Sequence, residues 1–349
     1  MDAVIKTQTK KFINLWPAMI AGLGLIIVAL GASGAINQYI QTVIMFIGIN
    51  IILSSSLNLV NGYMGEFSCG HGGFMLVGGY VSSILSILLF TDSPWLGHPL
   101  LPPSTAVFLF PVVIILGGLV SAVAGLLVAI PSFKTRDDYL AIITIAANFI
   151  FVALVNNFEF VGGSRGFMGM KGTIFAMEDL AQMPYMLIWT ITFATLAVFF
   201  IRRLMKSTLG KGISAIRYDE ISAEIMSVNT NNMKVVAFMF SSGLAGVAGG
   251  LFAHVLGFIN PASFSIMKST ECLVMVYLGG MGSLSDSVLS AIIFTFMLEA
   301  MRPLQILKWV LIPLMLILLM QFRPEGLLGN RELTDVFPKL KRFFTRREG

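Results

Sequence analysis

Residues 57–85, LNLVNGYMGEFSCGHGGFMLVGGYVSSIL, are apolar enough to lie in a membrane, yet they are rich in residues that disfavour a plain helix. Glycine loosens a helix, and a charge is costly near the centre of a bilayer. The stretch contains Glu66 and His71 beside Gly62, Gly65, Gly70, Gly72, Gly73, Gly78 and Gly79. These positions predict an element other than a plain membrane span.

The composition around this stretch is that of a polytopic membrane protein. The 349 residues are 56% hydrophobic and 12% charged, with a mean hydropathy of +0.86. A helix that crosses a bilayer needs about 20 predominantly apolar residues. Several uncharged runs are at least that long, namely 12–65, 67–91, 93–133, 139–158, 180–201 and 235–267.

These runs predict an all-α transmembrane helical bundle of about 8–10 spans, including short or broken helices. The first run, from Trp16 to about Gly31, also resembles a cleaved signal peptide. A second span follows almost at once, so a retained first span is favoured. The expected later spans lie near 39–58, 70–90, 104–130, 139–157, 183–201 and 233–256.

The chain after Glu271 divides less clearly. Its uncharged pieces, 272–285, 287–298 and 309–322, are each about 21 Å long or less as helix, which is short of a hydrocarbon core of about 30 Å. We therefore expect short or tilted helices here. Glycines are expected to break the chain before Asp286, at Gly279, Gly280 and Gly282.

The basic residues predict the orientation. The net charge is +5, but with both termini inside, 18 of the 23 lysines and arginines fall on the cytoplasmic side. The charge therefore reflects topology and not nucleic-acid binding. The expected parts are a cytoplasmic tail (1–16), a transmembrane domain (17–322) and a basic cytoplasmic tail (323–349).

Two loops have features of their own. The outer loop, 158–179, is long and glycine-rich, which predicts a structured lip. The inner loop, about 207–232, contains a short amphipathic helix, because Asp219 and Glu220 suit a helix N-terminus and Ile221, Ile225 and Val228 share one face. This helix is expected to lie on the membrane or to dock into a partner.

Neither an enzymatic site nor a nucleotide site is apparent in the sequence. His71, His98 and His254 are scattered, and no catalytic or zinc motif of local spacing occurs. Lys211 follows a glycine but lacks the upstream glycine of a phosphate-binding loop. Cys69, like Cys272, is interpreted as a small membrane-buried side chain. We expect no catalytic residue, no metal and no cofactor bound by this chain.

Ionisable residues within apolar stretches are the main functional candidates. They are Glu66, Glu271, Asp286 and Glu299. Glu66 and Asp286 are interpreted as lying at helix ends near the cytoplasmic interface, and Glu299 as paired with Arg302. A proton relay is the alternative interpretation. His71 is interpreted as a hydrogen-bonded packing residue and not as a ligand.

The glycines allow two interpretations. They let membrane helices approach closely, and they let a helix unwind to expose backbone groups to a solute. The helical spacing of glycines in SSGLAGVAGGLFA, 241–253, favours close packing. A weak internal echo, G-x-M-G-x-x-S, occurs at 62–68 and again at 279–285.

Several blocks, in order, resemble one family. They are LNLVNGYMGEFSCGHGGFMLVGGY (57–80), DDYLAIITIA (137–146), VGGSRG (161–166), STLGKGISAIRYDEISAEIMSVNTNNMKVVAFMFSSGLAGVAGGLFA (207–253), GFINPASF (257–264), VYLGGMGSLSDSVLSA (276–291) and MQFRPEGLLG (320–329). They resemble the inner-membrane permease subunits of ABC importers for branched-chain amino acids, the LivM/LivH type. The block DDYLAIITIA and the chain length favour the LivM-like half.

The resemblance implies a multi-pass subunit of the bacterial or archaeal inner membrane. Its partners would be a second homologous permease, two cytoplasmic ATP-binding subunits that use ATP and magnesium, and an external solute-binding protein. Transport would proceed by alternating access. The inner loop would couple to the ATPase through Asp219, Glu220, Ile221, Ala223, Glu224, Ile225 and Ser227. The substrate pathway would include Asn58, Gly62, Gly65, Glu66, Ser68, Gly70, His71 and Gly72.

Three residues depart from the family pattern. Ser227 and Asp286 stand where glycine is common, and Glu66 stands where glutamine is common. Glu66 and Asp286 leave the solute open, because the same family includes importers of urea, amides and other amino acids. Ser227 is expected to alter the turn that closes the short helix. A proton-coupled secondary transporter that uses Glu66 or Asp286 is the alternative from another class. A membrane-embedded enzyme would need an active-site cluster that the sequence does not contain.

Overall fold

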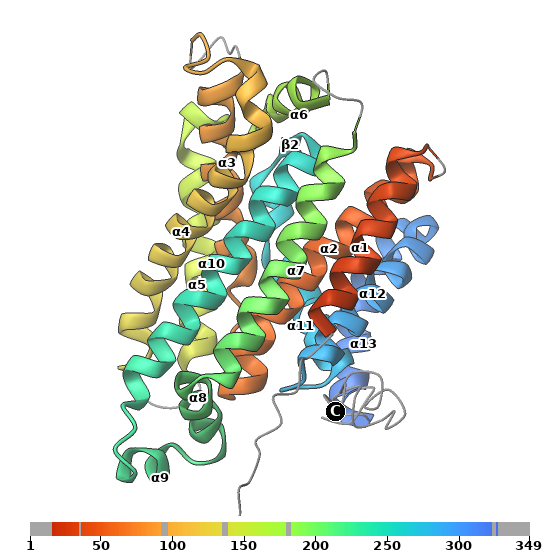
Figure 1. Cartoon of the computed structure of the whole chain (residues 1–349). Helices are drawn as coiled ribbons and strands as arrows, with labels where there is room; N and C mark the ends of the chain where they lie inside the picture. The colour runs from red at the N-terminus through yellow and green to blue at the C-terminus, as the bar shows by residue number, and fades with distance from the viewer. Residues whose placement is uncertain are drawn as a thin grey trace, which may run out of the picture.

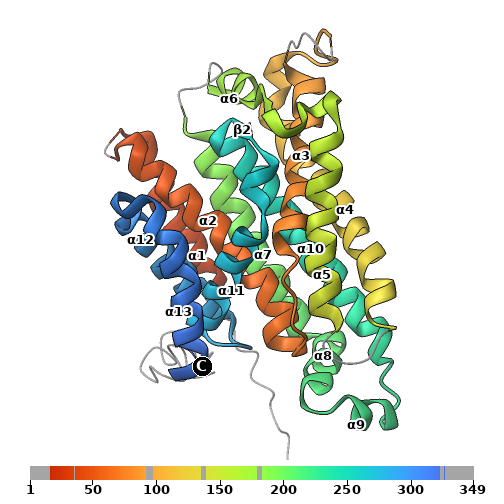
Figure 2. The same cartoon turned by 180° about the vertical axis from the view of Figure 1, so that it is seen from behind.

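The computed structural model describes residues 16–34, 36–91, 97–134, 139–178, 183–322 and 326. These residues form a helical bundle with one short strand pair (Figures 1 and 2). Within this described part of the chain, six helices are long and apolar enough to cross a membrane: Gln38–Met64, His71–Phe90 (α3), Ala106–Ser132 (α4), Tyr139–Asn157 (α5), Tyr185–Lys206 (α7) and Thr230–Leu256 (α10). The predicted all-α polytopic membrane bundle is confirmed.

The other apolar helices are shorter. They are α1 (Trp16–Ala32), α11 (Ile266–Gly279), α12 (Leu284–Ala300) and α13 (Lys308–Phe322). With 14 to 17 residues each, they are about 21–26 Å long, less than the core of a bilayer. The expected short helices and the glycine break before Asp286 are therefore confirmed.

The predicted start of α11 is wrong. The helix begins at Ile266 and not at Cys272, so it includes Lys268 and Glu271. The two charges form an ion pair one helical turn apart. Because this pairing lowers the cost of burying each charge, the helix extends through residues that break the uncharged run.

Different small elements close the two ends of the bundle. At one end, the α9 end, lie α8 (Thr208–Tyr218) and α9 (Glu220–Ile225). At the opposite end, the α6 end, lie α6 (Met170–Glu178) and the antiparallel pair of β1 (Phe167–Met168) with β2 (Phe258–Ile259), as Figure 1 shows. Two 3-10 turns, Glu159–Val161 and Gly163–Arg165, precede β1. The expected structured lip is confirmed across residues 158–178.

Glycines bring α3, α4 and α10 into backbone contact. A Cβ atom built at Gly78 would lie 2.2 Å from Cα of Gly246, and one at Gly249 would lie 1.9 Å from the carbonyl oxygen of Met75. The Ser121 hydroxyl of α4 lies within hydrogen-bond distance of Phe74 O (2.9 Å) and Ser242 O (2.8 Å). The close-packing interpretation of the glycines in residues 241–253 is confirmed.

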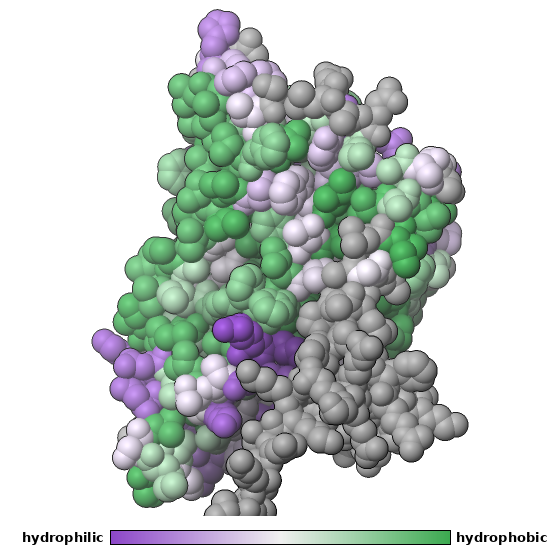
Figure 3. All heavy atoms as spheres, viewed as in Figure 1, coloured by the Kyte–Doolittle hydropathy of each residue, from purple (hydrophilic) through white to green (hydrophobic). Residues whose placement is uncertain are grey.

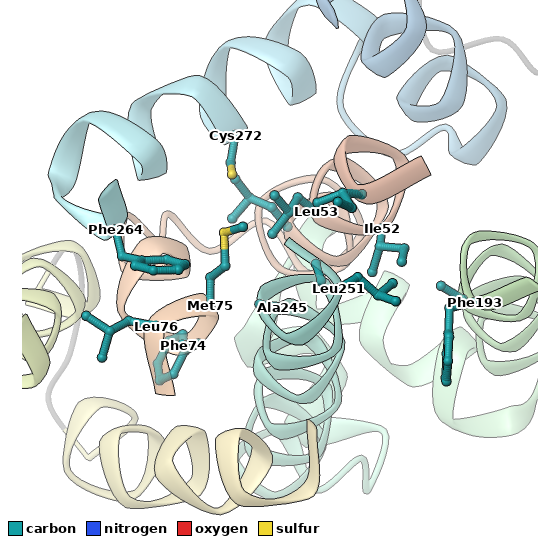
Figure 4. Packing of buried hydrophobic residues seen from close by; sticks show 14 of the residues in the cluster. Ile52, Leu53, Phe74, Met75, Leu76, Phe193, Ala245, Leu251, Phe264 and Cys272 are labelled. Carbon is teal, nitrogen blue, oxygen red and sulfur yellow. The ribbon is translucent and has the colours of Figure 1, made fainter. Parts of the chain in front are cut away.

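Apolar side chains fill the space between these helices and also cover the bundle. Figure 4 shows Leu53 and Met75, from α2 (Gln38–Asn58) and α3, near Cys272 of α11, and Leu251 of α10 in the same cluster. Cys69 and Cys272 are free and buried, as expected. On the outside, exposed apolar residues such as Phe108 cover α4 and α5, and Figure 3 shows hydrophobic residues across the middle of the visible face. Such a belt suits lipid contact, and the protein is a multi-pass membrane protein.

Candidate functional site

The stretch 57–85 contains the end of α2, the turn at residues 59–70 and most of α3. Helix α2 ends at Asn58 and continues as a π-helical turn, Leu59–Met64, before α3 begins at His71. Gly65, with φ of +83°, ends the π-helical turn in the left-handed conformation that favours glycine. A Cβ atom there would lie 3.1 Å from the Arg217 side chain of α8, so the turn lies at the α9 end.

Asn58 connects this turn to the break between α11 and α12. Its amide nitrogen donates to the Ser283 carbonyl oxygen (2.9 Å) and the Ser287 hydroxyl (2.7 Å), and its amide oxygen accepts from the Gly282 backbone (3.0 Å). Gly62 also packs here, since a Cβ atom on it would lie 2.5 Å from Gly282 N. The two segments that share the G-x-M-G-x-x-S pattern are therefore in contact.

We expect Asn58→Leu to lower the free energy of unfolding by about 3–5 kcal/mol. Each of the two hydrogen bonds that Asn58 Nδ2 donates contributes about 0.5–1.5 kcal/mol, and the Gly282 amide left without its acceptor costs about 1–3 kcal/mol more. Ser283 O and Ser287 Oγ remain hydrogen-bonded to each other (3.1 Å). Thermal unfolding of the purified protein in detergent measures the loss. Asn157→Leu is a matched control, because Asn157 is exposed and its side chain donates a hydrogen bond within its own helix, to Ala153 O. Equal melting temperatures for the two variants would contradict the assignment.

Lys234 joins the turn to the predicted coupling loop. Its Nζ lies 2.6 Å from Glu66 and 2.8 Å from Glu220, and its side chain is 9% exposed. Glu66 belongs to the turn, whereas Glu220 begins α9 and Lys234 lies in the first turns of α10. The expectation that Glu66 lies at a helix end is confirmed. The ion triad therefore connects α9 to the turn through the Lys234 side chain.

The remaining pathway candidates are buried between α3, α5, α10 and α11. The His71 Nε2 lies 3.3 Å from the hydroxyls of Ser56 and Ser241, as expected of a hydrogen-bonded packing residue. Ser68 N donates to Asn61 Oδ1 (3.2 Å), and Gly72 N donates to Ser269 Oγ (2.9 Å). Gly70 packs against Thr144. The pathway role of these residues stays a prediction.

The short helix in the inner loop forms as predicted at its start. Asp219 is the N-cap of α9, and its carboxylate accepts from the Ser222 hydroxyl (2.7 Å) and backbone (3.1 Å). These bonds hold the pKa of Asp219 below its usual value, so it is ionised at neutral pH. Glu224 accepts a hydrogen bond from Thr230 (2.7 Å).

The predicted apolar face of this helix is wrong at its third member. Helix α9 ends at Ile225, so Val228 does not lie on it. Val228 N instead donates to Ala223 O (3.1 Å), which turns the chain back toward α8. Ile221 and Ile225 are 71% and 78% exposed, while Ala223 is buried. The exposed apolar surface of α9 therefore consists of Ile221, Ile225 and the following Met226, also exposed.

Ser227 closes α9 in the left-handed conformation, with φ of +63°. Its amide donates to Glu224 O (2.9 Å), which with the Val228–Ala223 bond completes a Schellman turn. The left-handed region costs a non-glycine residue about 1–2 kcal/mol. We expect Ser227→Gly to stabilise α9 by about 1 kcal/mol, and Ser227→Ala to give no gain. Hydrogen exchange of the α9 amides measures this, and lower protection in Ser227→Gly would contradict it.

Polar cavities near the α6 end were not predicted. One, of about 280 Å³, is lined by Arg302, which follows α12, and by residues of α2, α10, α11 and α12, including Asn50, Lys268, Glu271 and Glu299. The expected pairing of Glu299 with Arg302 is confirmed at 3.0 Å. None of the predicted pathway residues lines this cavity. The i, i+3 spacing of Lys268 and Glu271 is the sequence signal that points to this region.

Asp286 lies in the first turn of α12. It is buried, and its backbone amide is within hydrogen-bond distance of the Ser283 cap (3.4 Å). A carboxylate in the first turn interacts favourably with the helix dipole. The expectation that Asp286 lies at a helix end is confirmed.

Comparisons with known proteins extend over most of the chain. Residues 39–320 match the family model of the branched-chain amino acid transport system permease component. The chain is 31% identical over 304 residues to the high-affinity branched-chain amino acid transport permease LivM of Salmonella typhimurium, covering 80% of this chain and 68% of the relative. It is similar to LivH of the same organism at 26% over 318 residues, covering 84% and 96%.

An archaeal relative is also similar. The probable branched-chain amino acid transport permease LivM of Methanocaldococcus jannaschii is 21% identical over 336 residues, which cover 87% of this chain and 96% of the relative. No solved structure matches the chain. The family match over most of the bundle, together with the ordered sequence blocks, shows that this chain belongs to the LivM-type branched-chain amino acid transport permeases.

Proposed function

We propose that this chain is the permease subunit of an ATP-driven importer. It moves branched-chain or related amino acids across the inner membrane of a bacterium or archaeon by alternating access. In this proposal both termini and α9 lie in the cytoplasm, and the α6 end faces outward. The positive-inside distribution of lysine and arginine supports this orientation.

The observation that carries the proposal is the exposed apolar surface of α9. Ile221, Ile225 and Met226 are exposed at the end of a membrane bundle. Their apolar surface is not covered by any other part of the described chain. A cytoplasmic subunit that covers this surface gains the corresponding burial energy. The Lys234 triad then connects that contact to the turn at residues 59–70. This arrangement suits a subunit whose energy comes from a partner.

The partners in this proposal are a second homologous permease, two cytoplasmic ATP-binding subunits that use ATP and magnesium, and an external solute-binding protein. Similarity to both LivM and LivH supports a pair of related permeases. ATP binding and hydrolysis at the partners drive the transport cycle. The permease contributes the membrane path and the surface through which the ATPase acts.

Co-purification tests the proposal. We expect a tagged chain to retain co-expressed ATP-binding subunits in mild detergent and Ile225→Glu to reduce their recovery about tenfold, since losing one apolar anchor costs on the order of 1.4 kcal/mol. Asn231→Glu is a matched control, because Asn231 is an exposed polar residue at the same end. A wild-type chain that purifies alone, or uptake driven by a pH gradient without ATP, would refute the proposal. Competition of leucine uptake by isoleucine, valine, alanine and urea identifies the solute class.

A further inference from the structure

A cavity between α2, α10, α11 and α12 contains charges of both signs. Its volume is about 280 Å³, near the lower end of the range of roughly 300–1,000 Å³ typical of small-molecule sites. A second hollow of about 370 Å³ adjoins it and shares Phe252, Lys268 and Glu271 with it. These three residues therefore stand between the two spaces.

The central charges are Lys268 and Glu271. Lys268 Nζ lies 2.8 Å from Glu271 Oε2, and the two side chains are 14% and 13% exposed. The Lys268 ammonium also lies 5.5 Å from the centre of the Phe252 ring. An ammonium and a carboxylate that are both largely buried, yet both line an open space, form a site with no net charge.

The rest of the cavity wall supplies an apolar surface and a neutral polar pair. The rings of Phe46 and Phe252 pack with centroids 6.0 Å apart, and Leu298 lies on the same wall. Deeper in α2, Asn50 Nδ2 donates to Thr295 Oγ1 (2.9 Å), and both residues line the space. The cavity thus combines an ammonium, a carboxylate and aromatic and aliphatic side chains.

A second pair of opposite charges lies beside the same cavity. Arg302 is 3.0 Å from Glu299, which also accepts a hydrogen bond from the Tyr39 hydroxyl. The Arg302 side chain is 67% exposed, whereas Lys268 and Glu271 are largely enclosed. The exposed pair therefore lies on the solvent side of the enclosed pair.

We propose that this cavity binds the zwitterionic head group of an α-amino acid. The Lys268 ammonium receives the carboxylate of the ligand, the Glu271 carboxylate receives its ammonium, and Phe46, Phe252 and Leu298 contact its apolar side chain. The inference rests on the proposed function and names the binding site for its substrate class. The site lies near the α6 end, which in the proposed orientation is the end from which an imported solute enters.

Charge balance explains why a zwitterion fits this site. When the ligand enters, the ion pair between Lys268 and Glu271 is exchanged for two ion pairs with the ligand, and every charge keeps a partner. A ligand with only a carboxylate or only an ammonium leaves Glu271 or Lys268 without its partner in an enclosed site. Because an unpaired buried charge is strongly unfavourable, the site discriminates against both.

Cysteine labelling of the assembled transporter tests the site. Leu298→Cys places a thiol on the cavity wall without removing a polar group, and its rate of reaction with a charged thiosulfonate reagent is measured with and without leucine. Labelling of the wild-type chain gives the background from Cys69 and Cys272, which are buried. Thr42→Cys is the matched control, because Thr42 lies near the same end of the bundle, on α2, but lines a different cavity.

We expect leucine to slow labelling of Leu298→Cys and to leave labelling of Thr42→Cys unchanged. The analogues 4-methylpentanoate and 3-methylbutylamine, which each lack one charge, should not protect. In a Lys268→Gln/Glu271→Gln background the leucine concentration for half-protection should rise at least about tenfold, from loss of both charge-assisted contacts. This double variant leaves no unpaired buried charge, so its fold is expected to persist.

The outcomes separate this site from the proposed function. If the assembled wild-type transporter takes up leucine but leucine leaves Leu298→Cys labelling unchanged, the site is overturned and the proposed function stands. Equal protection by either singly charged analogue also overturns it, as does unchanged protection in the double variant. If the assembly takes up none of leucine, isoleucine, valine and alanine, both the proposed function and this site are contradicted.

Discussion

Replacing Gly78 with alanine is expected to destabilise the folded bundle severely. A Cβ atom at Gly78 would lie 2.2 Å from Cα of Gly246, 2.3 Å from its carbonyl oxygen and 2.5 Å from its carbonyl carbon. All three atoms belong to the backbone of α10, so no side-chain rotation relieves the overlap. The two helices must move apart, and overpacking of this kind costs about 3 kcal/mol or more.

The separation also affects α4, which packs against both helices. The Ser121 hydroxyl contacts Phe74 O on α3 and Ser242 O on α10, and both distances lengthen if the helices separate. Thermal unfolding in detergent and the monodisperse yield measure the effect. Gly22→Ala is the matched control, because a Cβ atom at this glycine of α1 meets nothing within 4 Å. If Gly78→Ala melts at the same temperature as Gly22→Ala, the close helix contact is wrong.

Lys234→Met is expected to separate the turn from α9 while leaving the helices themselves in place. Lys234 is the cation shared by Glu66 and Glu220, whose side chains are 23% and 45% exposed. Removing one partner of a fully buried pair costs roughly 3–5 kcal/mol, and water reaches both carboxylates here, so the expected loss is on the order of 2 kcal/mol. Unfolding in detergent measures this loss.

A double-mutant cycle sharpens this prediction. Adding Glu66→Gln to Lys234→Met removes one of the carboxylates that has lost its cation, so the double variant should regain part of the stability. In the assembled transporter, Lys234→Met should also lower leucine uptake per ATP hydrolysed. Lys211→Met is the matched control, because Lys211 is an exposed lysine of the neighbouring α8. Unchanged coupling in Lys234→Met, or additive effects in the cycle, would contradict the triad's role.

The spans and the break between α11 and α12 were predictable because their signals are local. An apolar run predicts a spanning helix, since each helix forms its own backbone hydrogen bonds in lipid. The start of α9 was predictable for the same reason, because Asp219 caps the backbone only three residues away. The end of α9 was placed too late, since the turn at Ser227 uses a left-handed serine that periodicity does not reveal.

The candidate site was only partly predictable. Glu66, Glu220 and Glu271 drew attention because they are charged residues near apolar runs or at a helix start. Their partners did not follow from that pattern: Glu66 meets Lys234 far along the chain. The glycines of 57–85 also have two different roles, which the sequence alone did not distinguish. Gly65 forms the turn, whereas Gly78 serves helix packing.

The sequence by itself determined an all-α membrane bundle, its main spans, the start of a short helix after Asp219 and membership of a permease family. These properties follow from the hydropathy, caps and ordered motifs of contiguous residues. Only the tertiary structure decided that Asn58 holds the break before α12, that Lys234 joins the turn to α9, and that Lys268 and Glu271 line a cavity with Phe252. Those contacts depend on which helix faces meet, and that choice results from the packing of all the helices together.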